Sequence, residues 1–205
     1  MTLFNALRCH VADRPDAIAV QTPYRSASYR KMWSRIERST ARLQGEWRIV
    51  PGDTIVYFGC GHLDALVMFL AAARCGARVL PLEHPGLQAE AARFIAATGA
   101  ALVLHDDDIE PGDCSFGVPT RVLSSLIATV CRHRESGQEY SDRASLLEPS
   151  LDAPALRTRR TDELLATALA VPCRPGRVHG AMFDREVFAP VVLATMLHGA
   201  TLTLE

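Results

Sequence analysis

The chain has 205 residues, of which 48% are hydrophobic and 22% charged, and its formal net charge is −1 at pH 7. This balance is typical of a globular protein with a core, and it provides no net field that would attract nucleic acid or an anionic membrane. The six cysteines are dispersed without a C-x-x-C pair, no signal-peptide core begins the chain, and the longest apolar runs (residues 65–73 and 188–197) are too short to cross a bilayer. We therefore expect a soluble cytoplasmic protein that binds neither nucleic acid nor membranes.

The first 50 residues predict two helices and two strands. Leu3, Leu7 and Val11 lie at helical spacing and predict a first helix that ends before Pro15. Short stretches at 17–21 and 26–29 predict a pair of strands, and residues 30–46 predict a long helix.

Residues 51–106 predict a continuous β-α-β-α-β unit. Apolar runs at 54–58, 78–82 and 101–104 predict buried strands, each bounded by glycine or proline. The stretches between these runs have apolar helical faces and end at Gly76 and Gly99. Strands separated by helices of this length pair in parallel through right-handed crossovers. The sequence therefore predicts an α/β fold, a partial doubly wound, mostly parallel sheet with helices on both faces.

The second half of the chain has a weaker pattern. Three consecutive aspartates at 106–108 indicate a solvated acidic turn rather than a metal site. Further elements are predicted as strands at 118–123, 164–171 and 201–204 and as helices at 124–131 and 187–198. Residues 132–161 are polar and lack periodicity, which predicts a mobile linker or loop. The predicted organisation is an N-terminal α/β subdomain (1–131), this linker (132–161) and a C-terminal segment (162–205).

The first glycine-containing stretch, Gly59-Cys60-Gly61-His62-Leu63-Asp64, lies between a predicted strand and a predicted helix. A dinucleotide-binding loop would occupy this place, but it needs a small residue where Asp64 stands, and that carboxylate would oppose a pyrophosphate. We therefore interpret the stretch as a tight turn. A nucleophilic role for Cys60, next to His62, lacks an orienting partner in the sequence.

A second glycine-containing stretch covers residues 171–180. The backbone N–H groups of such loops can surround a phosphate, usually together with hydroxyl donors and a lysine. This stretch has neither, since Lys31 is the only lysine of the chain, and two prolines remove further donors. The candidate phosphate contacts are Gly176, Arg177, His179 and Gly180. A plain surface turn is the alternative, and these residue types favour it.

Five short motifs follow one another along residues 14–82. They are RPDAIAV (14–20), ASY (27–29), PGDTIV (51–56), FLAAARCG (69–76) and VLPL (79–82). In this order they resemble the N-terminal region of the adenylate-forming superfamily, which includes acyl-CoA synthetases and AMP-dependent ligases. The resemblance implies an acid–thiol ligase chemistry with ATP, AMP and Mg as ligands. A carboxylate is joined to AMP from ATP with release of pyrophosphate, and the acyl group is then transferred to a thiol with release of AMP.

The resemblance weakens after residue 106. Residues 176–180 are similar to the second half of the family's phosphate loop, with His179 in place of its lysine, whereas residues 171–175 keep none of its hydroxyls. Counterparts of the adenine and ribose motifs, the acyl pocket and the C-terminal domain are missing from the sequence. Each missing donor costs about 10²–10³ in rate. We therefore expect a truncated and degenerate member, inactive alone, that serves as an accessory or binding protein or is a remnant.

Two alternatives stay open for the function. The chain is either a subunit of a split acyl-adenylating enzyme that another chain completes, or an unrelated small α/β nucleotide-binding protein. An open strand edge at 201–204, next to the helix at 187–198, predicts a homodimer or a protein partner at that place. If residues 110–165 fold back over this edge, the expected surface is covered instead.

Overall fold

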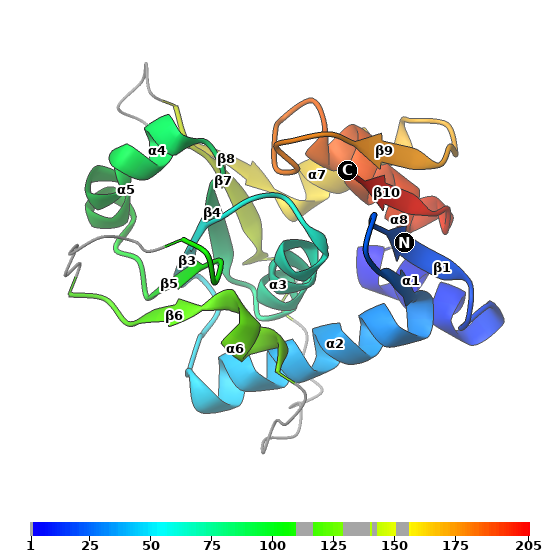
Figure 1. The fold of residues 1–205 in the computed structure, drawn as a ribbon, viewed down its shortest axis with the longest axis horizontal. Coiled ribbons are helices and arrows are strands. Elements are labelled where there is room, and N and C mark those ends of the chain that lie inside the picture. The colour runs from blue at the N-terminus through cyan, green and yellow to red at the C-terminus, as the bar shows by residue number, and fades with distance from the viewer. Residues whose placement is uncertain (1, 110–116, 129–139, 141–142, 151–155) are drawn as a thin grey trace.

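The strands of the protein form two mostly parallel sheets flanked by helices (Figure 1). The computed structural model describes residues 2–109, 117–128, 140, 143–150 and 156–205. The helices are α1 (Leu3–Asp13), α2 (Tyr29–Ala41), α3 (Leu63–Arg74), α4 (Pro85–Ala89), α5 (Ala91–Thr98), α6 (Leu123–Ile127), α7 (Thr161–Leu169) and α8 (Ala194–His198), with π-helical turns η1 (Arg42–Glu46) and η3 (Phe188–Leu193). The predicted α/β class is confirmed, but the strands divide between two sheets where one was expected.

The larger sheet has six strands in the order β6-β5-β3-β4-β7-β8. Its members are β3 (Thr54–Phe58), β4 (Arg78–Leu82), β5 (Leu102–His105), β6 (Thr120–Val122), β7 (Ser145–Glu148) and β8 (Arg157–Arg160). All pair in parallel except β8, which runs antiparallel to β7 at one edge. Strand β3 is buried along its whole length, because a central parallel strand is covered on both faces.

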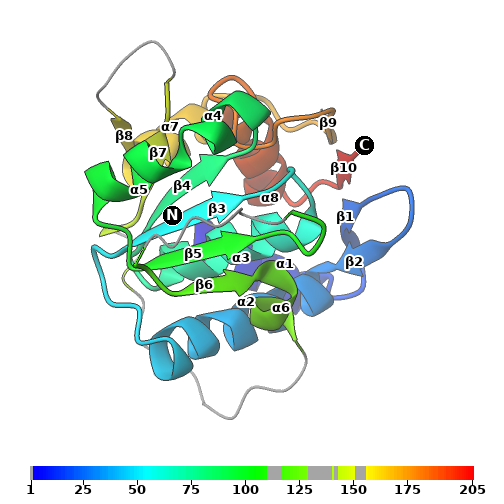
Figure 2. The same cartoon turned by 60° about the vertical axis from the view of Figure 1, so that its left-hand side comes forward.

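Helices cover both faces of the larger sheet (Figure 2), and alternate residues of β3 therefore belong to two different hydrophobic clusters. Ile55 and Tyr57 pack in the cluster that contains α2, α3 and α6, while Val56 and Phe58 pack in the one that contains α5. Helix α3 lies between the sheet and α2, and its residues are therefore almost all apolar and buried.

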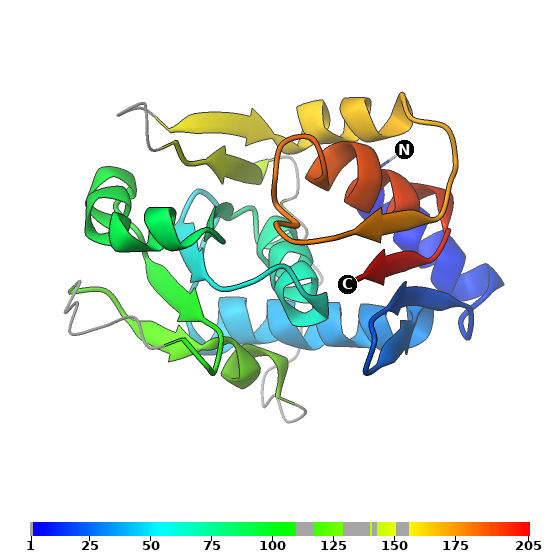
Figure 3. The same cartoon turned by 45° about the horizontal axis from the view of Figure 1, so that its top comes forward.

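The smaller sheet joins the two ends of the chain (Figure 3). Its order is β2-β1-β10-β9, built from β1 (Ile18–Gln21), β2 (Ser26–Ser28), β9 (Gly176–Val178) and β10 (Leu202–Leu204). Val20 of β1 pairs with Leu202 of β10, and the buried Tyr29 hydroxyl donates to the Ala200 carbonyl at 2.9 Å. Helix α1 packs against α8 beside this sheet.

The open strand edge predicted at 201–204 is wrong, because β10 has β1 on one side and β9 on the other. The residues of α8 before His198 are buried as well. An interface through this strand and helix therefore loses its physical basis, although a partner for the chain stays a prediction. The sequence pattern placed β1 beside β2 and gave no sign that β1 also pairs with a strand about 180 residues later.

Two further predictions differ from the structure. The stretch 132–161 contains β7 and β8, which join the larger sheet; each has only four residues, and the polar pattern of β8 suits an edge strand. Other parts of 132–161 lie outside the described residues. Residues 164–171 are mostly helix α7, whose buried Leu164 and Ala168 lie four residues apart on its inner face, so the strand predicted there is wrong. Within the described residues, no helix has the length and apolar character needed to cross a bilayer.

Candidate functional site

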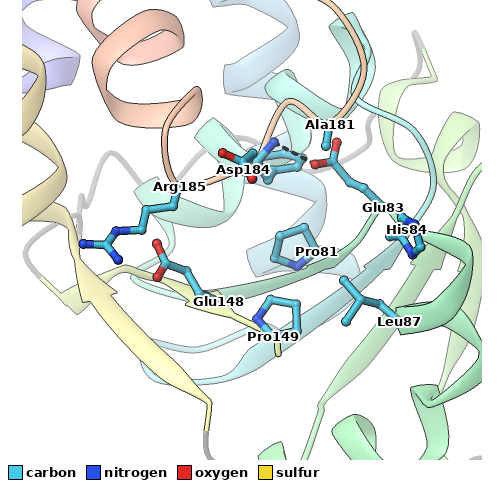
Figure 4. Close-up of a pocket in the computed structure, with 10 residues that line it drawn as sticks. Pro81, Glu83, His84, Leu87, Glu148, Pro149, Ala181, Asp184 and Arg185 are labelled. Atoms are coloured by element: carbon cyan, nitrogen blue, oxygen red, sulfur yellow. Dashed lines mark hydrogen bonds between the residues drawn. The ribbon is translucent and has the colours of Figure 1, made fainter. Parts of the chain in front are cut away.

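The candidate site lies at the carboxyl edge of the larger sheet. Strands β3, β4, β5 and β7 are parallel, so the segments that follow them meet at one edge, where open α/β sheets hold their ligands. Two cavities open there. The first has a volume of about 350 Å³ and lies beyond β4 and β7 (Figure 4), and the second, of about 310 Å³, lies beyond β3 and β5.

The first cavity combines an apolar floor with carboxylates. Pro81, Leu87, Pro149 and Phe183 supply apolar surface, and the remaining lining residues are Glu83, His84, Glu148, Ala181, Asp184 and Arg185. Figure 4 shows Glu83 and Asp184 on one side of the cavity and the guanidinium of Arg185 directed away from Glu83. Segments about 100 positions apart in the sequence thus form one wall.

Glu83 connects the end of β4 to the loop at 181–184. Its carboxylate accepts the backbone N–H groups of Met182 at 3.1 Å and Phe183 at 2.7 Å. Burial raises the pKa of Glu83 to about 7, although these two hydrogen bonds oppose the shift. Gly61 permits the approach, since a β-carbon there would overlap Met182 and Glu83. The cavity therefore holds a carboxyl group that changes charge near neutral pH.

Packing of aromatic rings also holds the loop at 181–184 in place. The Phe183 ring lies 5.8 Å from Phe69 of α3 and 5.1 Å from Phe188 of η3, measured between ring centroids. Such ring pairs add stabilisation beyond their buried area. The loop is therefore held by packing as well as by Glu83, and the cavity wall is preformed.

The other two carboxylates of the cavity differ in their partners. Glu148 accepts from the buried Arg159 at 3.3 Å and lies 3.9 Å from Arg157, so its charge is compensated. Asp184 is exposed, and its side chain accepts the Glu186 N–H at 2.7 Å. No ion pair within the described residues involves Glu83 or Asp184. These two carboxylates are therefore the ones of this cavity that have no compensating cation among the described residues.

The second cavity borders a polar network centred on the buried Asp106 at the end of β5. Its carboxylate accepts from the Tyr57 hydroxyl at 2.8 Å, the Cys60 N–H at 2.8 Å and His62 Nε2 at 2.9 Å. Burial opposes ionisation of Asp106, but these hydrogen bonds outweigh it and lower its pKa. Burial and the adjacent carboxylate raise the pKa of Tyr57, which therefore remains a donor. The network ties the β3–α3 turn to β5.

This network leaves no activated nucleophile. His62 Nδ1 accepts the Asp64 N–H at 3.2 Å, so the ring proton is on Nε2 and faces Asp106. Neither ring nitrogen is left to take a proton from Cys60. Burial and nearby carboxylates also raise the pKa of the Cys60 thiol, which keeps it protonated at neutral pH.

The turn at 59–64 borders the second cavity and packs closely at its glycines. A β-carbon at Gly59 would overlap the side chains of Asp106 and Tyr57, so this glycine serves close packing. Asp64 is engaged by Arg25 at 2.8 Å and Arg35 at 3.5 Å. The interpretation of this stretch as a tight turn is confirmed. Around it, the described residues include no group of three metal-ligating side chains arranged to hold an ion.

The four predicted phosphate contacts do not converge. Gly176 and Arg177 belong to β9, whose extended backbone pairs with β10, and extended N–H groups alternate in direction instead of surrounding one point. His179 is exposed, with its Nδ1 3.2 Å from a carboxylate oxygen of Glu205, and Gly180 has a left-handed φ of 83° next to open space. The strand predicted at 164–171, which would lead into a phosphate-binding loop, is helix α7, and residues 176–178 form strand β9. Phosphate binding by these residues stays a prediction without geometric support.

Comparison with known proteins gives the family. The model described as "AMP-binding enzyme" matches residues 7–164. The chain belongs to the AMP-binding enzyme family. The D-alanine–D-alanyl carrier protein ligase of Bacillus licheniformis is 26% identical over 122 residues, which cover 58% of this chain and 24% of the ligase.

Solved structures share the fold of this AMP-binding family member. Unliganded o-succinylbenzoate CoA synthetase of Bacillus subtilis has a TM-score of 0.80 and 14% identity, over 98% of this chain and 43% of that chain. The N-terminal subdomain of Klebsiella oxytoca NpsA has a TM-score of 0.78 and 17% identity, over 98% of this chain and 54% of that chain. The synthetase has also been solved with AMP and with ATP and a magnesium ion. The chain thus spans about half the length of these solved relatives.

Glu83, Asp106 and Asp184 are the site residues that sequence reasoning missed. A local signal existed for the first two, because each is a carboxylate within two residues of the end of a predicted parallel strand, where ligand sites form. No such signal existed for Asp184, which does not follow a predicted strand. Its neighbourhood depends on the long-range contact between the segment after β4 and the loop at 181–184.

Proposed function

We propose that this chain is a binding member of the AMP-binding family that takes a small amine-bearing ligand and does not adenylate acids by itself. The observation that carries the proposal is the pair of carboxylates, Glu83 and Asp184, beside an apolar floor at the carboxyl edge. An ammonium group gains charge-assisted hydrogen bonds from carboxylates, whereas a phosphate is repelled by them.

The described residues do not fit the phosphates of ATP. The chain's one lysine, Lys31, is exposed on α2, and residues 176–178 are extended. The cavity beside the turn at 59–64 is lined by the aspartates at 64 and 106–108, whose carboxylates repel a phosphate. Acyl adenylation needs cations and donors on the transferring phosphoryl group, and each such donor is worth about 10²–10³ in rate. This supports a binding role over catalysis for the isolated chain.

Calorimetric titration of the isolated chain tests the amine site with matched ligands. Ethylamine carries the ammonium group alone, propionate carries a carboxylate alone, and D-alanine, which occurs in the name of one relative, carries both. We expect binding of ethylamine, and no binding of propionate. Affinity for ethylamine should rise from pH 6 to pH 8 because Glu83, with a pKa of about 7, ionises in that range. Equal heats from propionate and ethylamine would contradict the proposal.

Three substitutions locate the binding. Asp184→Asn keeps an acceptor for the Glu186 N–H, and Glu83→Gln keeps one acceptor for the N–H groups of the loop at 181–184, but each removes a charge from the cavity. Each should weaken ethylamine binding about tenfold, since a hydrogen bond to a charged group contributes about 1.5–3 kcal/mol. Glu186→Gln is the matched control, because this exposed carboxylate does not line the cavity. Weakening by the control alone would refute the assignment.

A second candidate function is a subunit of a split acyl-adenylating enzyme. The alignment with solved structures favours this candidate, because 98% of this chain aligns with only about half of each solved relative. ATP–pyrophosphate exchange with a panel of carboxylic acids separates the two. The binding role predicts no exchange above a His179→Ala control, with or without the product of an adjacent reading frame. Exchange that appears only with that product would favour the split enzyme.

A further inference from the structure

Helix α2 presents a basic face at the periphery of the molecule (Figure 1). We define the basic face as Arg30, Lys31, Ser34, Arg35 and Arg38, which together line an open groove of about 380 Å³. The opposite side of α2 is buried, with Met32, Trp33 and Ile36 in the core. The long cationic side chains therefore have no role in packing the sheet, and the face is presented to solvent.

The cations of this face are only partly neutralised. Arg30 pairs with Asp16 at 3.0 Å on the exposed surface, and Arg35 lies 3.5 Å from Asp64. Lys31 has no carboxylate partner within the described residues, and Arg38 donates to the neutral Ser34 hydroxyl. In addition, the Arg38 Nε–H has no hydrogen-bond partner in the described part of the chain. A local positive surface thus exists on a protein whose net charge is −1.

The β1–β2 hairpin carries an aromatic anchor next to this face. Tyr24 is 97% exposed, the most exposed large hydrophobic residue described. The turn that holds it is closed by the Thr22 N–H and hydroxyl, both donating to the Arg25 carbonyl. Arg25 shares Asp64 with Arg35, which links the hairpin to α2, and Figure 3 shows the hairpin beside the N-terminal end of α2. Tyrosine and arginine are the residue types that most often anchor protein interfaces.

We infer that the basic face of α2, with Tyr24, is a docking surface for an acidic helix of a partner protein. The charge pattern carries this inference. Positions 30, 34 and 38 repeat every four residues, with the cations Lys31 and Arg35 beside them, and this face matches glutamates at i, i+4 and i+8 on a facing helix. A nucleic acid is disfavoured, because the net charge of the chain is negative and one exposed aromatic side chain does not form a stacking platform. This surface is separate from the cavity, so the inference does not depend on the proposed ligand.

Fluorescence anisotropy tests the inference with a designed helical peptide that carries glutamates at i, i+4 and i+8. Lys31→Gln with Arg38→Gln should weaken binding of the intact chain about tenfold, and Tyr24→Ala about threefold. Lys31→Glu with Arg38→Glu should reverse the preference, so that the matching lysine peptide binds more tightly than the glutamate peptide. Arg93→Gln with Arg143→Gln is the control, because it removes the same charge elsewhere on the surface and should leave binding unchanged. Circular dichroism melting confirms that each variant is folded.

Three outcomes would overturn the inference. The first is a control variant that loses as much affinity as the variant of Lys31 and Arg38, which would indicate a general charge effect. The second is a single-stranded oligonucleotide that binds more tightly than the glutamate peptide at the same ionic strength. The third is a sedimentation experiment in which the natural chain self-associates and the charge-reversed variant is a monomer. That result would make the face an interface between copies of this chain.

Discussion

Glu83→Gln should change the pH dependence of folding stability in a predictable way. Burial holds the pKa of Glu83 at about 7 against an ordinary value of 4.5. The folded protein therefore binds this proton more tightly than the unfolded chain, and the contribution of Glu83 to stability falls as pH rises from about 4.5 to about 7. Integrated between pH 5 and pH 8, the loss is about 2.5 kcal/mol. A glutamine cannot ionise, so the variant lacks this loss.

Urea unfolding of both proteins at pH 5 and at pH 8 measures the effect. The stability of Glu83→Gln relative to the natural chain should rise by about 2.5 kcal/mol between the two pH values. Other titrating groups are common to both proteins and cancel in the difference. Glu186→Gln, which alters an exposed carboxylate of the neighbouring segment, should show no such change. A difference that stays constant, or that falls with pH, would refute the assignment of a buried, readily protonated carboxyl at this place.

Three further substitutions test the packing of the site in unfolding experiments. Tyr57→Phe removes the hydroxyl that donates to Asp106 and should cost about 1–3 kcal/mol; a loss below about 0.5 kcal/mol would speak against the network. Gly61→Ala brings a β-carbon against Met182 and should cost about 1–3 kcal/mol while also weakening ethylamine binding; unchanged binding would contradict the close packing. The pKa of Asp106 is lowered from its ordinary value of 3.8, so its stabilisation is present above that value and is lost as pH falls through the folded pKa. Asp106→Asn should therefore be less stable than the natural chain at pH 7, and this deficit should shrink as pH falls below about 4; a deficit that does not change with pH would refute this.

The central strands of the larger sheet could be predicted because burial on both faces makes each of them a continuous apolar run. Strand β3 is the clearest case, and its bounds in the structure are those predicted. Strand β8 could not be predicted, because its sequence, Arg157-Thr158-Arg159-Arg160, is polar and only its antiparallel pairing with β7 makes it a strand. Residues 164–171 were misread because a short apolar run suits a strand and a helix equally, and the packing of α7 against η3 decides.

The candidate site was predictable only in part, and the reason is distance along the chain. The carboxyl edge of the parallel strands follows from their order, and with it the positions of Glu83 and Asp106. The cavity itself needs the loop at 181–184, which reaches Glu83 through two backbone hydrogen bonds across about 100 residues. The motif at 176–180 resembled a phosphate-binding loop because of its glycines, but glycines also occur in strands that pack closely. A β-carbon at Gly176 would overlap the Thr195 side chain.

Heteronuclear NMR titration of the isolated chain with ethylammonium chloride and, in a parallel series, with ATP and magnesium shows which of the two ligands binds at the carboxyl edge of the larger sheet. We expect ethylammonium to shift the amide signals of residues 83–84, 181 and 183–185, which line the cavity, and ATP with magnesium to leave these signals in place. Shifts of these signals by ATP with magnesium at lower concentrations than by ethylammonium would contradict the claim that the carboxyl edge of this sheet binds an amine and not a nucleotide.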